Sequence, residues 1–175
     1  MAYRNKTFVS FASEDLSSYR LMTAWKANKN IDFNFYDAHD LNTARDTSHP
    51  DTIKRRLRER LGNAKQIVLL VGDITRTKAA RTNSFIRYEV DVIKDLDIPI
   101  IFANLNQSRE SESSRVPSAL GSPLYTISTS FQPAIIKYAL DNFPAAYAKN
   151  KSATGTSKKV GPYYYNDSVY TSLGI

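Results

Sequence analysis

The sequence predicts an α/β protein of the flavodoxin-like, three-layer class, with a central parallel sheet of about five strands in the order 2-1-3-4-5. Strand-like and helix-like segments alternate along its 175 residues. Residues 65–72 and 98–105 are continuous apolar runs, as expected for strands that are buried on both faces of a parallel sheet. The short crossovers between these segments favour the flavodoxin-like strand order.

The first part of the chain predicts a strand, a helix and a second strand. Residues 6–13, KTFVSFAS, are rich in β-branched and aromatic side chains, and Ser13 can cap a helix that runs to about Lys26. Residues 31–37, IDFNFYD, alternate between apolar and polar, which indicates a half-buried strand. The polar segment AHDLNTARDTSHP then predicts a loop of about a dozen residues, long enough to suggest a functional role.

A basic helix is expected over residues 53–61, IKRRLRERL. Ser48 and Asp51 have the spacing of a capping box before it, and Gly62 provides a stop. The net charge of the chain is +7, and much of it lies here and in residues 148–159. We interpret these charges as a solvated surface, and nucleic-acid binding through the arginines of 53–61 is a minor alternative.

The second half predicts the remaining strands and helices. A polar loop is expected between the strand at 65–72 and a helix over 83–96. After the strand at 98–105, residues 106–119 are expected to form a loop or a weak helix. Residues 123–128 are expected to form a short final strand, and Ser130 can cap a helix that runs to about Asn142.

The domain prediction is one α/β domain over residues 1–147, followed by a linker and a Tyr-rich tail over 148–175. The Lys-, Ser- and Gly-containing stretch after residue 147 has the composition of a linker. The tyrosines of the tail are expected to pack on the domain or on a partner.

Composition excludes several classes of site. The chain has no cysteine, so it has no disulfide, thiolate zinc site or cysteine nucleophile. Only two histidines are present, which argues against a multi-histidine metal site, and we predict no metal. The sequence shows neither a signal peptide nor an apolar run long enough to cross a membrane, so we expect a cytoplasmic protein without a membrane partner.

Glu89 is the most unusual polar residue of the predicted helix over 83–96. At about 100° per residue, it falls in the middle of an apolar stripe formed by Phe85, Val92, Ile93 and Leu96. A carboxylate on the core face of a helix is costly unless a partner or a pocket compensates it. In the predicted strand order, ligands bind outside the carboxyl ends of the first and third strands, where this helix begins. We therefore expect Glu89 beside that crevice.

The sequence lacks the motifs of several enzymes that share this topology. It contains neither the dinucleotide-binding glycine pattern nor a P-loop, and no hydrolase nucleophile elbow. A phospho-receiver site would need acids, which Glu14, Asp15 and Asp73 could supply, but the last predicted strand is not followed by the lysine that it also needs.

One carboxylate among aromatic residues suits the cleavage of an N-glycosidic bond. Its transition state resembles an oxocarbenium ion, which a carboxylate can stabilise or trap. A base such as nicotinamide leaves the ribose as a neutral molecule, so its departure needs no strong general acid. Phe11, Phe85 and Tyr88 could stack on the substrate, Asp37 could lie nearby, and Arg45 in the long loop could meet phosphates.

Four sequence segments carry a family resemblance: KTFVSFASED, FNFYD, KQIVLLVG and NSFIRYEV. In this order and spacing they resemble the bacterial TIR-like domains, and especially the TIR proteins of the Thoeris anti-phage systems, over roughly residues 6–140. The resemblance implies that Glu89 is the catalytic carboxylate and that Ser10, Phe11 and Asp37 lie beside the substrate. Phe85 stands where such domains often have Trp.

The resemblance also implies a substrate, a product and partners. It predicts an enzyme that removes nicotinamide from NAD and makes ADP-ribose or a cyclic ADP-ribose isomer. NAD is then a substrate, and no tightly bound cofactor is expected. The cyclic product would act as a messenger to an effector protein, and self-association or a phage-derived activator remain open.

Two other functions remain open on the sequence. One is a TIR-type interaction module without catalysis, because the fold alone does not make an enzyme. The other is a nucleoside N-glycosidase or deoxyribosyltransferase, which uses similar chemistry on a smaller substrate. Glu89 itself could be a structural carboxylate that pairs with an arginine such as Arg45, Arg76 or Arg81.

Overall fold

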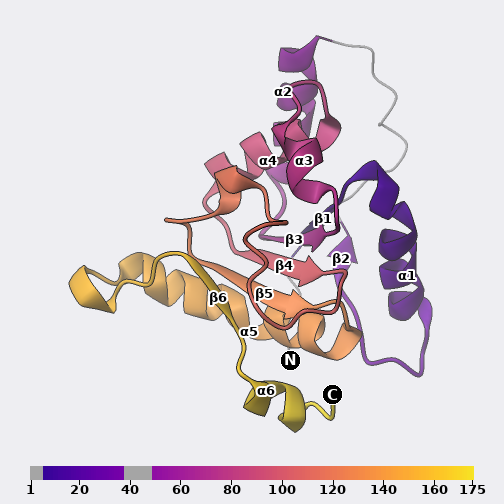
Figure 1. The fold of residues 1–175 in the computed structure, drawn as a ribbon, viewed down its shortest axis with the longest axis vertical. Coiled ribbons are helices and arrows are strands. Elements are labelled where there is room, and N and C mark those ends of the chain that lie inside the picture. Colours follow the sequence, from indigo (N-terminus) through magenta and orange to yellow (C-terminus); the bar gives the residue numbers. More distant parts are fainter. Residues whose placement is uncertain (1–5, 38–48) are drawn as a thin grey trace.

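The part of the chain that the structure describes forms a central sheet of six parallel strands in the order β2-β1-β3-β4-β5-β6 (Figure 1). The computed structural model describes residues 6–37 and 49–175, with the backbone alone at 36–37. The strands are β1 (Lys6–Ser10), β2 (Tyr36–Asp37), β3 (Gln66–Val71), β4 (Ile100–Asn104), β5 (Thr126–Ser130) and β6 (Pro162–Tyr164). The predicted order of the first five strands is confirmed, and β6 adds a sixth strand beyond β5.

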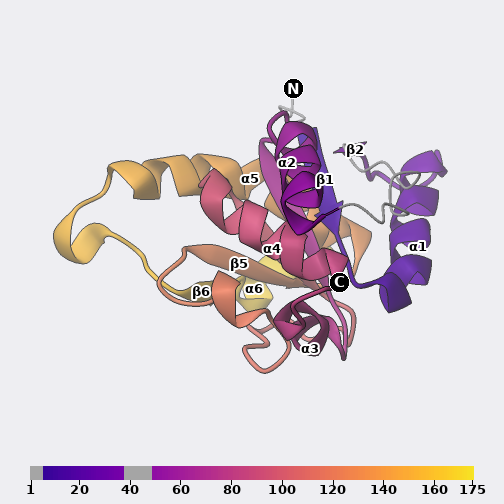
Figure 2. The ribbon, with the colours of Figure 1, turned by 90° about the horizontal axis from the view of Figure 1, so that it is seen from above.

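Helices cover both faces of the sheet and complete the three layers (Figures 1 and 2). The α-helices are α1 (Leu16–Ala27), α2 (Pro50–Leu61), α3 (Thr75–Ala80), α4 (Phe85–Leu96), α5 (Pro133–Ser152) and α6 (Asp167–Ser172). Among the described residues, short 3-10 helices are η1 (Ser13–Asp15), η3 (Ser118–Leu120) and η4 (Gly155–Ser157). Helices α2 and α4 pack side by side on one face, and α1 and α5 contribute to the core on the other.

The alternation of side chains along each strand decides which layer they join. Phe8 lies in the core with α2 and α4, whereas Val9 lies in the core with α1 and α5. Ser10 therefore faces α2 and α4, two residues after Phe8, at the carboxyl end of β1. The strand order reverses between β1 and β3, so the crevice predicted for a ligand lies at this end.

The structure corrects the sequence prediction in several segments. The second strand, expected over residues 31–37, is limited to Tyr36–Asp37. The segment after β3, expected to be a loop, contains α3, which begins where the Gly72 N–H donates a 2.8 Å hydrogen bond to the Thr75 hydroxyl. The last predicted strand is shifted from 123–128 to 126–130. It was misplaced because its sequence, TISTS, is mostly polar although every residue is buried.

The C-terminal segment is more ordered than the sequence suggests. Helix α5 continues to Ser152, well past Asn142 and past the start of the expected linker. β6 then pairs with β5, and α6 buries the Tyr170 side chain completely. The tail tyrosine therefore packs on the domain, whereas a separate unit over residues 1–147 stays a prediction. Within the described residues, no helix has both the length and the apolar character to span a membrane.

Candidate active site

Glu89 and Ser10 form a buried contact across 79 positions of sequence. The Ser10 hydroxyl donates a 2.5 Å hydrogen bond to Oε2 of Glu89. Ser10 is fully buried, and Glu89 is 8% exposed. The contact joins the carboxyl end of β1 to the second turn of α4, at the place where the sheet topology puts a ligand crevice.

The surroundings of Glu89 raise the pKa of its carboxyl group. Burial raises its pKa to about 7, while the hydrogen bond from Ser10 and the positive charge of Arg60 oppose that rise. Near neutral pH, the protonated and ionised forms are therefore both populated. Such a poised carboxyl group is common at catalytic sites.

Helix α4 places Glu89 through its first turn. Ser84 caps the helix, with its Oγ accepting a 3.2 Å hydrogen bond from the Arg87 N–H, and its hydroxyl donates to the Lys78 carbonyl of α3. The prediction that Glu89 lies on the apolar face is confirmed. Phe85 was wrongly placed in the buried stripe, because the first turn projects beyond the core and leaves it 42% exposed. The side chains that α4 buries besides Glu89 are Ile86, Tyr88, Val90, Val92 and Ile93.

Gly72 and Asp15 lie against each other on the β1–β3 side of the crevice. A Cβ atom on Gly72 would lie only 2.5 Å from Oδ2 of Asp15, so a larger residue here would displace the Asp15 carboxyl group. Burial and the charges of Glu14 and Asp73 raise the pKa of Asp15. Asp15 is thus a second carboxyl group with a raised pKa at the same end of the sheet.

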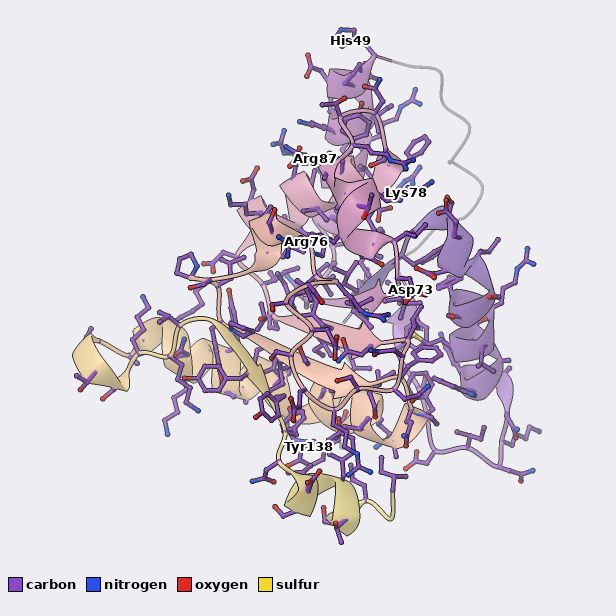
Figure 3. The ribbon with its side chains drawn as sticks, in the orientation of Figure 1. His49, Asp73, Arg76, Lys78, Arg87 and Tyr138 are labelled. Atoms are coloured by element: carbon purple, nitrogen blue, oxygen red, sulfur yellow. The ribbon has the colours of Figure 1, made fainter. Side chains whose placement is uncertain are left out.

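The neighbouring acids are neutralised by cations. Lys78 of α3 lies 2.5 Å from Glu14, and Arg115 forms an ion pair with Asp73. Figure 3 shows Asp73 and Lys78 near α3, on its side toward α1. Among the described residues, no group of three histidine or acidic side chains has the arrangement of a metal site.

The predicted substrate-binding residues are only partly brought together. Phe11 faces the other layer, where its ring stacks on Tyr19 with centroids 4.7 Å apart. Tyr88 is buried with α2, and its ring lies 5.8 Å from Nζ of Lys54. Phe85 lies one turn before Glu89 and is exposed. Asp37 ends β2, with its side chain outside the description, and Arg45 lies outside the described residues.

The sequence analysis did not place Arg60 or Asp15 beside this crevice. Arg60 comes from the helix packed beside α4, and no local pattern links it to Glu89. Arg76, one of the arginines expected as a possible partner of Glu89, donates a 2.5 Å hydrogen bond to the Ser113 carbonyl. The signal for Asp15 was its place just after the first strand, next to Glu14.

The arrangement can supply one desolvated carboxylate, a hydroxyl donor and an exposed aromatic ring. The face of α4 that carries Glu89 reaches solvent at Phe85, one turn earlier. A cationic centre that reached Glu89 there would be strongly stabilised, because water does not screen the carboxylate. The family model described as "Thoeris protein ThsB, TIR-like domain" matches residues 8–110, which include the end of β1 and the whole of β3, α4 and β4.

Proposed function

The chain belongs to the TIR-like domain family of the Thoeris protein ThsB, and from this premise we propose that it cleaves the nicotinamide N-glycosidic bond of NAD. Family membership by itself gives the chain a TIR-type role in defence. The catalytic proposal goes further, and rests on one observation: the buried carboxyl group of Glu89, hydrogen-bonded to Ser10 beside the β1–β3 switch point.

In the proposed reaction, the bond between the ribose C1′ and the nicotinamide nitrogen breaks, and its electron pair leaves with nicotinamide. The pyridinium nitrogen of NAD becomes neutral, while positive charge develops on the ribose ring. Ionised Glu89 stabilises that charge, and the site excludes the water that would weaken the attraction. Ser10 holds the carboxylate in place and, as a donor, favours its ionised form.

The ribose cation is then captured by a nucleophile. Capture by water forms a C1′–O bond, releases a proton and gives ADP-ribose. Capture by another atom of the same molecule gives a cyclic ADP-ribose isomer. The proposed signal is this product, and the proposed partner is an effector protein that recognises it. Phe85, with its exposed ring, is the proposed stacking surface for a base of NAD.

The proposal is tested by incubating the protein with NAD and identifying the products by mass spectrometry, with and without lysate from phage-infected cells. Free nucleosides serve as parallel substrates. We expect nicotinamide to be released from NAD, together with one ADP-ribosyl product. Turnover of nucleosides but not of NAD would favour a nucleoside N-glycosidase or deoxyribosyltransferase. A folded protein that releases no nicotinamide under either condition would be an interaction module.

A further inference from the structure

A cavity of about 290 Å³ lies on the α4 side of the sheet, between β4, β5 and the chain that joins them. Phe102 and Ser128, which are paired in register, line it from the two strands. Val116 and Leu120 of the connecting chain line it as well, together with Pro162 of β6 and Arg76 of α3. Neither Glu89 nor Ser10 lines this cavity, so it is separate from the candidate active site.

Ser128 brings an unused hydroxyl group to a mostly apolar cavity. Its side chain is completely buried, and its Oγ has no hydrogen-bond partner among the described residues. Buried hydroxyl groups in proteins nearly always have such a partner. Thr126 and Ser130 lie on the same face of β5 and also lack a partner there, but they do not line the cavity. Among these three hydroxyls, only Ser128 can therefore meet a cavity ligand.

Arg76 brings a positive charge to the same cavity. Its Nη1 donates to the Ser113 carbonyl, which uses one of the five N–H donors of a guanidinium. Within the part of the chain that the structure describes, Arg76 forms no ion pair, while Glu112, the acid of the lining, has Arg115 beside it at 3.8 Å. In Figure 3, the side chain of Arg76 is labelled beside its helix α3, on the side away from α1. This cation is available to a ligand.

We propose that this cavity binds a small carboxylic acid with an apolar ring and a second polar group, its carboxylate on Arg76 and its polar group on the Ser128 hydroxyl. The apolar lining would hold the ring, and the guanidinium can form paired hydrogen bonds with a carboxylate. The volume lies at the lower limit of ligand pockets, so it suits a one-ring acid rather than a dinucleotide.

Three probes test the two polar contacts separately: 4-hydroxybenzoate, benzoate and 4-hydroxybenzamide. Binding to the full chain is followed by amide chemical shifts, with NAD absent. We expect 4-hydroxybenzoate to bind best. Benzoate, which lacks the group for Ser128, should bind about threefold to tenfold more weakly. 4-Hydroxybenzamide, which lacks the charge for Arg76, should bind at least about tenfold more weakly.

Variants connect each contact to its residue. Ser128→Ala should weaken the binding of 4-hydroxybenzoate about threefold to tenfold and leave the affinity for benzoate unchanged. Arg76→Gln should weaken the binding of both acids. Thr126→Val is the matched control, because it removes a buried hydroxyl outside the cavity, and it should change neither affinity. Arg76 is exposed, so its variant keeps the test decisive even if Ser128→Ala fails to fold.

Two results would overturn the inference. One is the absence of saturable shifts with all three probes up to about 10 mM, a range in which even contacts worth only a few kcal/mol are detected. The other is binding that Arg76→Gln leaves unchanged. Either result leaves the proposed NAD cleavage untouched, because the assay contains no NAD and neither residue contacts Glu89 in the proposed reaction.

Discussion

At the scale of single residues, the protein keeps a carboxyl group in a place that favours its neutral form. Glu89 was predictable from sequence as an acid on an apolar helix face, and Ser10 as a residue at the end of the first strand. Their direct contact was not, because it joins residues 79 positions apart. The contribution of Arg60 was hidden for the same reason: it depends on how α2 packs beside α4.

The pKa of Glu89 predicts how its substitution changes stability. In the unfolded chain the group loses its proton near pH 4.5, but in the fold only near pH 7. Stability should therefore fall as pH rises from about 4.5 to 7, by about 3 kcal/mol in total. Glu89→Gln should remove most of this fall in the free energy of unfolding between low and high pH, as measured by urea unfolding at pH 4 and pH 8. Glu59→Gln, which changes an exposed acid of α2, should preserve it. Equal pH dependence in both variants would contradict the burial argument.

Ser10 predicts the pH dependence of the proposed reaction. Because the reaction needs ionised Glu89, kcat/KM should rise with pH, with a midpoint near the pKa of about 7. Ser10→Ala removes a donor that lowers this pKa, so the midpoint should move upward by about one pH unit. Ser17→Ala, on the exposed side of α1, serves as the control. A lower rate with an unmoved midpoint would show that Ser10 acts only on packing.

At the scale of elements, polar sequences account for the errors of prediction. β5 consists of TISTS, and its hydroxyl groups are buried by neighbours that lie elsewhere in the sequence. α3 is only six residues long, and its start depends on the Gly72–Thr75 hydrogen bond rather than on an apolar period. In contrast, α4 and β3 were predicted well, because their periodicity and continuous apolar runs reflect the layers that they join.

The docking of α6 depends on Tyr170. Its hydroxyl accepts a 3.0 Å hydrogen bond from the Ser130 N–H, and the Arg109 guanidinium lies 4.3 Å from its ring centroid. Tyr170→Phe would leave a buried N–H without that acceptor, which should cost about 1–3 kcal/mol of unfolding free energy. Tyr164→Phe, at a 51% exposed tyrosine, should change stability by less than about 0.5 kcal/mol. Equal effects in chemical denaturation would refute this role of the hydroxyl.

At the scale of the whole molecule, the parallel sheet could be predicted, but not its sixth strand. β6 has three exposed residues, and only its pairing with β5 identifies it as a strand. Helix α5 extends beyond the sheet before the chain returns along β5 (Figure 1). The composition of this returning segment resembles a linker, whereas its position depends on long-range contacts such as that of Tyr170 with Ser130.

Removing residues 153–175 tests whether this segment is part of the folded unit. The truncated chain loses β6, α6 and a fully buried tyrosine, so we expect it to lose at least about 3 kcal/mol of stability. Thermal unfolding of the full and shortened chains measures the difference. An unchanged midpoint would support the domain boundary near residue 147 that the sequence suggests.

The rate of nicotinamide release from NAD by Glu89→Gln, compared with the unaltered chain, tests the central claim most directly. The glutamine keeps the shape of the side chain and an oxygen that can accept the hydrogen bond from Ser10, but it cannot carry the negative charge. We predict a loss of at least about a hundredfold in rate, while the variant remains folded. Release of nicotinamide at an undiminished rate by the folded variant would contradict the assignment of Glu89 as the catalytic carboxylate.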